Sequence, residues 1–200
     1  MIRGGLVSRR SVLVVAGATT VTALGAVPAL AVTKSEAERL VGRLVDDINA
    51  VIDSGKSEAG MIRDFEAIFR RYGDLPLIAA SAFGPDARRA SNAQKKAFTD
   101  AFTGYIARKY GKRFREFIGA RLEVQDTRSG RNRFEVKTTA FLRGQSPFEI
   151  AFFVSAESGL FFNMFIEGVN LLLSERTEIG AMLDQRGGSI SRLARDLRNT

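Results

Sequence analysis

The chain has 200 residues, a length typical of one domain, and its 30 Lys and Arg against 22 Asp and Glu give a formal net charge of +8. It contains no Cys, His or Trp. These absences exclude Ser-His and Cys-His nucleophilic sites, zinc sites with the usual ligands and haem held by histidine. With 45% hydrophobic and 26% charged residues, the composition is typical of a folded domain.

Residues 1–31 have the pattern of an export signal. Arg3, Arg9 and Arg10 precede an apolar run at residues 12–27 that carries no charge and is short for a membrane span. The run Ser-Arg-Arg-Ser-Val-Leu around the arginine pair matches the twin-arginine pattern, which favours export by the Tat route.

Small residues at Ala29 and Ala31 predict cleavage after Ala31. We therefore expect a Tat-type signal peptide at residues 1–31 and one periplasmic domain at residues 32–200. The alternatives are an uncleaved N-terminal anchor and an internal helix. No Cys follows the apolar run, so a lipoprotein anchor is not expected.

The basic charge does not indicate nucleic-acid binding. Loss of Arg3, Arg9 and Arg10 lowers the net charge from +8 to +5. The remaining Lys and Arg are scattered along amphipathic segments, and an exported protein seldom meets nucleic acid. Nucleic acid is therefore not an expected partner.

Helical spacing of apolar residues predicts two helices at the start of the domain. The first begins at a capping box formed by Thr33 and Glu36 and ends at Gly55. The second carries an apolar face that begins at Met61, and it stops at Gly73.

Two further helices are predicted before residue 120. A short one opens at Asp74 and closes at Gly84, and a long one begins near Ser91 and runs past Tyr110. The apolar stripe of the long helix contains Phe98, Ala101, Phe102, Tyr105 and Ile106 and extends to Phe114 and Phe117.

Alternating apolar residues then predict four strands joined by turns of about four residues, an antiparallel meander. The strands begin near Ala120 and at residues 133, 148 and 160, and the last strand is apolar on both faces. Two helices, near residues 174–185 and 189–197, close the chain. The fold class is therefore α+β: N-terminal helices packed over a curved four-stranded antiparallel sheet, followed by C-terminal helices.

Helices over one face of a curved sheet enclose a cone, and the apolar sheet face is either an ordinary core or the wall of an apolar pocket. Phe suits a dry cavity because it brings no polar group that needs a partner. If there is a pocket, its predicted lining is Phe98, Phe102, Tyr105, Phe134, Val136, Thr138, Phe148, Ile150, Phe152, Phe162, Met164 and Ile166. Trp at Val136 or Ile150 would then fill the pocket and leave the protein folded.

Polar residues offer little chemistry. Asp46 and Asp47 lie on the polar face of the first helix, where carboxylates are solvated. Glu167, after the last strand, is the best candidate for a polar contact at the pocket rim, and Gly168 is interpreted as a bulge or close approach. No catalytic residue, metal site or cofactor is predicted.

Residues 94–110, with Phe98, Phe102, Tyr105 and Tyr110, and residues 162–171, with Glu167-Gly168-Val169, are similar to two stretches of the MlaC, or toluene-tolerance, family of periplasmic phospholipid-binding proteins. Residues 94–110 resemble the family's Q-x-x-x-F-x-x-x-F-x-x-Y-x-x-x-x-Y pattern, and residues 162–171 resemble Y-D-x-x-x-E/D-G-V-S followed by a hydrophobic residue. The sequence departs from that pattern at Asn163, where Asp is usual, at Asn170, where Ser is usual, and at Glu175, where an aromatic residue often precedes the Arg.

The resemblance implies an NTF2-like cone that holds phospholipid tails, with the head group near a rim at Glu167 and Asn170. It implies a monomeric carrier with phospholipid as cargo and no other cofactor. Its implied partners are an inner-membrane ABC transporter complex and an outer-membrane lipoprotein complex, in a system that maintains outer-membrane lipid asymmetry.

Three alternatives stay open. An NTF2-like enzyme would need a buried carboxylate or a Tyr-acid pair inside the cone, and an exported adaptor would have the apolar face only as core. A hopanoid in place of phospholipid is a variant of the carrier function.

Overall fold

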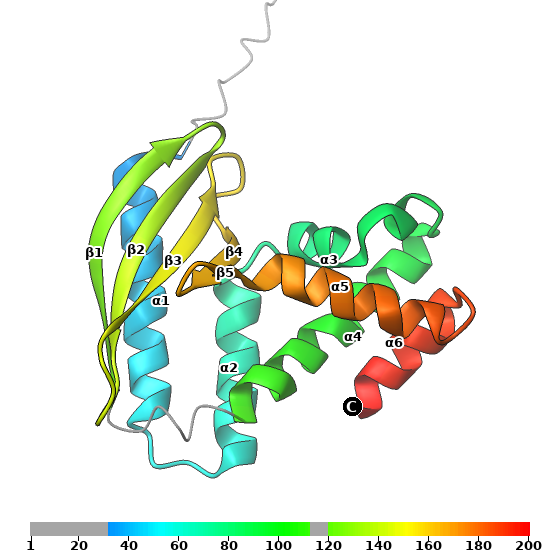
Figure 1. The fold of residues 1–200 in the computed structure, drawn as a ribbon, viewed down its shortest axis with the longest axis horizontal. Coiled ribbons are helices and arrows are strands. Elements are labelled where there is room, and N and C mark those ends of the chain that lie inside the picture. Colours follow the sequence, from blue (N-terminus) through cyan, green and yellow to red (C-terminus); the bar gives the residue numbers. More distant parts are fainter. Residues whose placement is uncertain (1–31, 113–119) are drawn as a thin grey trace, which may run out of the picture. The chain divides into compact units, whose positions relative to one another are not determined.

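The computed structural model describes residues 32–112 and 120–200, and Figure 1 shows their fold. The predicted signal peptide lies outside these residues, as do Phe114 and Phe117. None of the helices within the described ranges combines the length and hydropathy needed to cross a bilayer.

The first two helices are α1 (Lys34–Ile52) and α2 (Glu58–Tyr72). The predicted capping box at the start of α1 is confirmed. The Thr33 side chain accepts a hydrogen bond from the Glu36 amide at 3.2 Å, and the Glu36 carboxylate accepts one from the Thr33 amide at 2.7 Å. Both contacts satisfy backbone amides that have no partner inside the helix.

The short helix α3 (Leu75–Phe83) starts at the Asp74 cap and is followed by a 3₁₀ segment, η1 (Gly84–Arg88). The long helix α4 (Asn92–Gly111) starts at a second capping box, formed by Ser91 and Gln94. Both helices therefore begin where the local sequence predicts them.

The sheet is an antiparallel meander in the order β1-β2-β3-β4-β5. The strands span Arg121–Gly130, Arg133–Phe141, Phe148–Ser155, Phe161–Ile166 and Val169–Asn170. The α+β class with a curved sheet is confirmed, but the prediction of four strands was wrong by one. Glu167 and Gly168, with φ of 50° and 80°, form a two-residue turn that returns Val169–Asn170 to β4.

The same turn corrects two local expectations. Gly168 is neither a bulge nor a close approach, because a Cβ at this position would meet no atom within 4 Å. Its role is to supply a positive φ at the tip of the hairpin.

The chain ends in α5 (Leu171–Asp184) and α6 (Ile190–Asn199). Helix α5 begins three residues before the predicted Ser174. Asn170 is its N-cap, since the Asn170 side chain accepts a hydrogen bond from the Leu173 amide at 3.1 Å.

Helix α1 covers the β1–β2 part of the sheet, and α2 packs between α1 and α4 (Figure 1). Helix α3 packs on α4 and α5, and α6 packs on α4. The alternation predicted for β2 is confirmed: Val136, Thr138 and Ala140 face the core and are fully buried. Thr138 is tolerated there because its hydroxyl donates to the Ile150 carbonyl at 2.9 Å.

Candidate functional site

An apolar pocket with a volume of about 110 Å³ lies among α1, α2, α3, α4, β3, β4 and the start of α5. Its lining is mostly aromatic and aliphatic. The lining residues are Leu44, Ile48, Phe65, Ile68, Phe69, Ile78, Phe102, Ile106, Tyr110, Phe152, Phe161, Phe162, Asn163, Met164, Leu171, Leu172 and Glu175.

Strand β4 supplies a large share of this lining because its pairing with β3 shifts register. Phe153 pairs with Asn163, but Val154 pairs with Phe161, so Phe162 is an extra residue on β4. Such a bulge changes the direction of the side chains around it. As a result the consecutive residues Phe161 and Phe162 both line the pocket, although neighbouring residues of a regular strand face opposite sides of the sheet.

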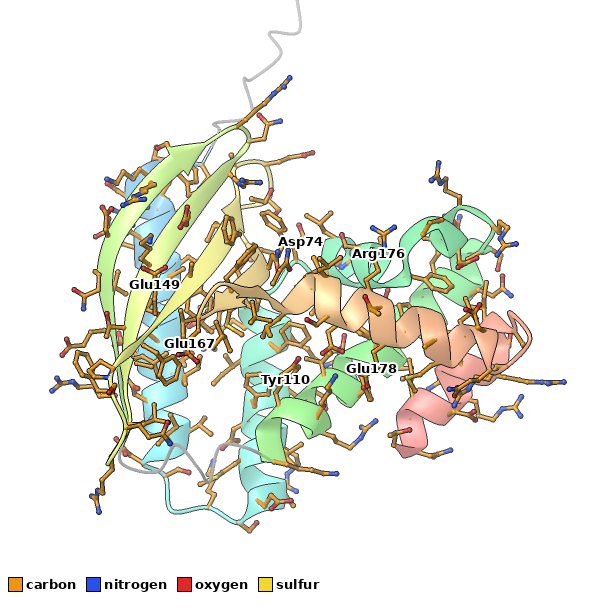
Figure 2. All side chains as sticks on the ribbon, in the orientation of Figure 1. Asp74, Tyr110, Glu149, Glu167, Arg176 and Glu178 are labelled. Atoms are coloured by element: carbon orange, nitrogen blue, oxygen red, sulfur yellow. The ribbon has the colours of Figure 1, made fainter. Side chains whose placement is uncertain are left out.

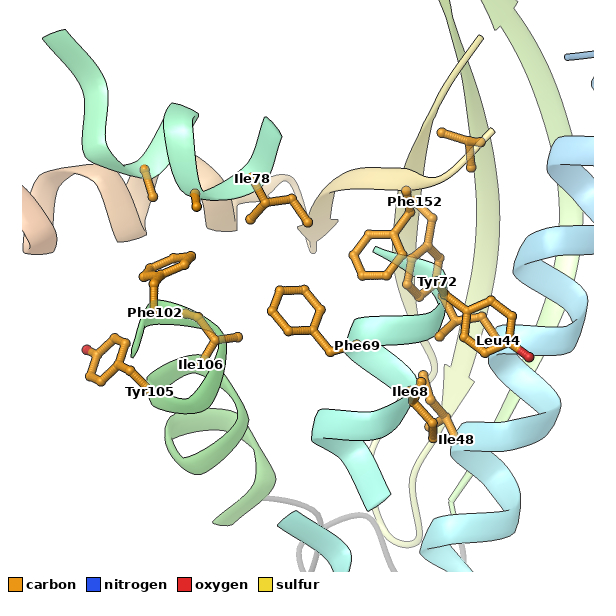
Figure 3. Close-up of a cluster of buried hydrophobic side chains, with 14 of the residues drawn as sticks. Leu44, Ile48, Ile68, Phe69, Tyr72, Ile78, Phe102, Tyr105, Ile106 and Phe152 are labelled. Atoms are coloured by element: carbon orange, nitrogen blue, oxygen red, sulfur yellow. The ribbon is translucent and has the colours of Figure 1, made fainter. Parts of the chain in front are cut away.

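Aromatic contacts join β4 to the helices across the interior. The Phe161 ring lies 5.9 Å from that of Phe69 on α2 and 6.2 Å, edge-on, from that of Phe152 on β3. Figure 3 shows Phe69, Ile78 and Ile106 pointing toward one another from three helices. These separations are favourable for ring pairs, so the wall is ordered by specific contacts as well as by burial.

The connection between α2 and α3 is fastened to the same strand. The Asp74 amide donates to the Phe161 carbonyl at 2.8 Å, beside a single bridge between Gly73 and Phe161. These backbone contacts fix the end of α2, and therefore Phe69, against β4.

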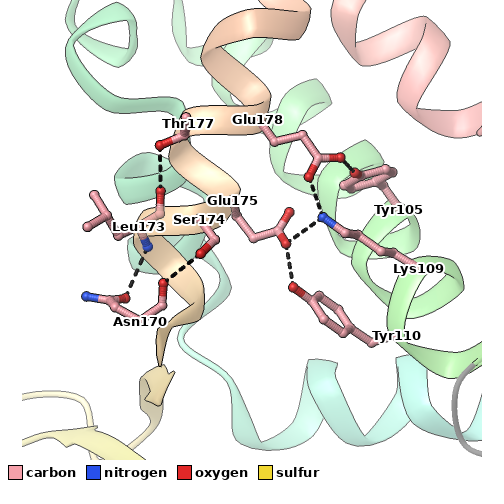
Figure 4. Close-up of polar contacts among 9 residues, drawn as sticks. All are labelled: Tyr105, Lys109, Tyr110, Asn170, Leu173, Ser174, Glu175, Thr177 and Glu178. Carbon is pink, nitrogen blue, oxygen red and sulfur yellow. Dashed lines mark hydrogen bonds and ion pairs between the residues drawn. The ribbon is translucent and has the colours of Figure 1, made fainter. Parts of the chain in front are cut away.

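One side of the pocket carries a polar cluster between α4 and α5, shown in Figure 4. Glu175 accepts hydrogen bonds from Lys109 Nζ at 2.8 Å and from the Tyr110 hydroxyl at 2.5 Å. Lys109 also donates to Glu178 at 2.5 Å, and Glu178 accepts from the Tyr105 hydroxyl. The cluster thus ties the last turns of α4 to the middle of α5.

The contacts within the cluster move the pKa values of its ionisable groups further from pH 7. Burial and the hydrogen bond to Glu178 raise the pKa of Tyr105 to about 12. Burial and the hydrogen bond to Glu175 raise the pKa of Tyr110. Burial alone would lower the pKa of Lys109, but its hydrogen bonds to both glutamates raise it, while those from Lys109 and Tyr105 lower the pKa of Glu178.

At neutral pH these four groups therefore hold fixed protonation states. General acid-base catalysis works best when a group titrates near the working pH, and these shifts run in the opposite direction. Tyr110 and Glu175 form the kind of buried Tyr-acid pair that an NTF2-like enzyme would need, but the raised pKa of Tyr110 does not favour proton transfer near neutral pH. Among the residues that the structure describes, no group of three or more Asp and Glu is placed to hold a metal ion.

Four of the twelve residues predicted for the cavity line this pocket: Phe102, Phe152, Phe162 and Met164. The other eight lie outside its lining. They are Phe98, Tyr105, Phe134, Val136, Thr138, Phe148, Ile150 and Ile166.

These eight belong mainly to the core that α1 and the neighbouring helices cover. Val136 and Thr138 are fully buried on β2, a strand that α1 packs on, and Ile150 is 6% exposed. Phe98 stacks on Phe83 of α3, with ring centres 4.4 Å apart. The sheet face is therefore core where α1 covers it and pocket wall toward β4.

The two rim candidates also lie outside the lining. Glu167 is exposed at the β4–β5 turn (Figure 2). Asn170 is half-buried, and besides capping α5 it accepts a hydrogen bond from Asn163 at 3.1 Å.

The sequence analysis did not assign to the pocket the residues that α1, α2 and α3 supply. Leu44 and Ile48 of α1 and Phe69 of α2 were recognisable as apolar helix faces, but helical spacing does not separate pocket from core. Glu175 stood out only as a polar residue where the family pattern often has an aromatic one. Its partners Lys109 and Tyr110 are 66 and 65 residues away in the chain.

Comparisons with known proteins identify a matching family and a similar solved structure. The family profile described as MlaC protein matches residues 39–199. A solved structure of a phospholipid-binding protein from Ralstonia solanacearum, in complex with a phospholipid, is similar with a TM-score of 0.69 and 18% sequence identity. The similarity covers 82% of this chain and 95% of that one. No curated protein matches the chain by sequence.

Proposed function

This chain belongs to the MlaC family, and we propose that it is a non-enzymatic phospholipid carrier that holds acyl chains in the pocket between α2, α4, β4 and α5. The observation that carries the proposal is the pocket itself, whose lining is apolar except for Asn163, Glu175 and the Tyr110 hydroxyl. The phospholipid in the similar Ralstonia solanacearum protein supports the same ligand class.

The energetics suit a carrier. Burying one CH₂ group is worth about 0.8 kcal/mol, so two 16-carbon chains represent roughly 25 kcal/mol of gross burial. The net affinity is far smaller, because the membrane that gives up the lipid already buries those chains. A near balance between the two environments allows both loading and release.

The pocket must widen to take such a lipid. Its volume of about 110 Å³ is below the roughly 300–1,000 Å³ of ordinary ligand sites and below the ~150 Å³ that holds a benzene molecule. Phe162, Met164 and Leu172 line the pocket and are only half-buried. We expect this β4–α5 side to move when lipid enters, since fewer contacts are lost there than in the core.

Location and partners extend the proposal. The twin-arginine pattern supports export to the periplasm, where we propose that the carrier exchanges lipid with an inner-membrane ABC transporter and an outer-membrane lipoprotein complex. Replacing Arg9 and Arg10 by Lys tests the route: the variant should stay in the cytoplasm of a Tat-competent bacterium, and normal export would contradict Tat transport.

The decisive experiment identifies the cargo. The protein is purified from the periplasm of an expressing bacterium, extracted with organic solvent and analysed by mass spectrometry beside a periplasmic protein of similar size. Stoichiometric phospholipid is expected. A hopanoid in the extract would show that the cargo is not phospholipid. Folded protein that yields no lipid would contradict the carrier function.

A further inference from the structure

Glu175 is an unusual residue for the wall of an apolar pocket. It lines the pocket from α5, and its side chain is only 5% exposed. Carboxylates are rarely buried to this extent unless their oxygens are all provided with partners.

Only one of the two oxygens of this carboxylate has hydrogen-bond partners among the described residues. Oε1 accepts from Lys109 and Tyr110, whereas Oε2 is buried and has no hydrogen-bond partner among the residues that the structure describes. Figure 4 shows the second oxygen turned away from both donors. Because the two contacts to Oε1 hold the side chain in place, Oε2 is a fixed and unused acceptor.

The charge around this acceptor is negative. Within the part of the chain that the structure describes, Glu175 and Glu178 share one cation, Lys109, which leaves one net negative charge among these three groups. Two other cations of these helices, Arg176 and Arg108, point elsewhere. Arg176 lies beside Gly84 at the α3 side of α5 (Figure 2), and Arg108 donates to the Leu197 carbonyl.

We propose that Oε2 of Glu175 accepts a hydrogen bond from the polar end of the bound lipid, so that the pocket selects phospholipids whose head group carries N–H or O–H donors. Ethanolamine and glycerol head groups carry such donors, whereas choline has none. This inference rests on the proposed carrier function and adds a chemical class of head group to it.

The test offers three lipids at once. Wild-type protein is incubated with vesicles of phosphatidylethanolamine, phosphatidylglycerol and phosphatidylcholine in equal amounts with identical acyl chains, and the captured lipid is quantified by mass spectrometry. A charge-assisted hydrogen bond predicts enrichment of a donor-bearing lipid over phosphatidylcholine on the order of tenfold. The ratio of the first two lipids shows whether ammonium or hydroxyl is the donor.

Two variants locate the effect. Glu175→Gln keeps a carbonyl oxygen for Lys109 and Tyr110 but turns a donor toward the lipid, so the enrichment should disappear. Glu178→Gln removes the same charge from the same cluster, but Glu178 is 45% exposed and does not line the pocket, so the enrichment should persist. Circular dichroism and total captured lipid verify that both variants are folded.

Each outcome is informative. Equal capture of the three lipids by wild-type protein overturns the selection and leaves the carrier function intact. Loss of enrichment in Glu178→Gln to the same extent as in Glu175→Gln also overturns it, since bulk charge would then suffice. Capture of no lipid at all contradicts the carrier function and the selection together. The wild-type comparison stands even if a variant fails to fold.

Discussion

Asn163 of β4 donates a hydrogen bond from Nδ2 to Oδ1 of Asn170, the N-cap of α5, over 3.1 Å. Both residues depart from the family pattern that the sequence resembles, which has Asp and Ser at these positions. The side-chain Oδ1 of Asn163 also accepts hydrogen bonds from the backbone amides of Met164 and Leu172. The two departures are therefore partners, and together they connect the pocket strand to the helix that carries Glu175.

The pair predicts a compensating substitution. Asn163→Asp removes the donor and sets two acceptor oxygens against each other, so it should lower the free energy of unfolding by about 1–2 kcal/mol. Adding Asn170→Ser should recover most of the loss, because a serine hydroxyl can donate to Asp and still cap α5. Urea unfolding of the four proteins in the double-mutant cycle measures the coupling. Strict additivity of the two changes would contradict the partnership.

Leu172 and Leu173 offer a matched pair for testing the pocket. Leu172 lines it, whereas Leu173 is 59% exposed and does not. Leu172→Trp should fill the cavity and lower co-purifying lipid about tenfold or more, which corresponds to ~1.4 kcal/mol of binding. Leu173→Trp should leave the lipid unchanged. Equal lipid in the two purified variants, measured by mass spectrometry, would show that acyl chains lie elsewhere.

Trp at Val136 or Ile150 should act on stability instead. The sequence-based expectation is that such a variant stays folded and loses lipid, but both residues lie in the core outside the pocket lining. Overpacking a close-packed core typically costs about 1–3 kcal/mol, and the jump from Val to Trp is larger than most. We expect the free energy of unfolding to fall by more than about 3 kcal/mol in urea titrations. A variant that keeps the stability of the wild type but loses lipid would show that these residues line the cavity.

Lys109 should be essential for burying Glu175. Lys109→Met leaves the carboxylate without its cation and should cost up to about 3 kcal/mol of unfolding free energy. Combining it with Glu175→Leu should recover much of that loss. Lys96→Met on the same helix is the control, since its side chain is 79% exposed in the pair with Asp100 and such pairs are worth about 0.5 kcal/mol. Similar losses for the two lysines would contradict a special role for Lys109.

The polar cluster should also limit stability at high pH. The pKa of Tyr105 is raised from 10.0 to about 12 in the folded protein, so the neutral tyrosine is favoured by folding. This contribution is fully present below pH 10 and is lost as the pH rises toward 12. Tyr105→Phe should therefore lose less unfolding free energy than wild type between pH 9 and pH 11, as followed by urea unfolding at each pH. If the unfolding free energies of the two proteins fall in parallel as the pH rises, Tyr105 is not a source of the lost stability.

Much of the fold could be predicted because its signals act over a few residues. The capping boxes at Thr33 and Ser91, the Asp74 cap and the alternation along β2 all depend on neighbours within one turn or one strand. The starts of α1, α3 and α4 and the buried face of β2 were therefore correct from sequence. The fifth strand was not, because a turn with two positive φ values at Glu167–Gly168 has no strong signal when one of the residues is Glu.

The tertiary structure decided which apolar residues make the pocket. Alternation assigns Val136 and Phe152 to the same face, and both are buried, but only the packing of the helices leaves Phe152 and not Val136 on the pocket wall. Only the register shift at Phe162 turns β4 toward the cavity. Glu175 meets Lys109 across 66 residues of sequence, a distance at which side-chain spacing carries no information. The sequence by itself thus determined the elements and their apolar faces, whereas long-range packing chose the faces that close on one another and the face that stays open to a ligand.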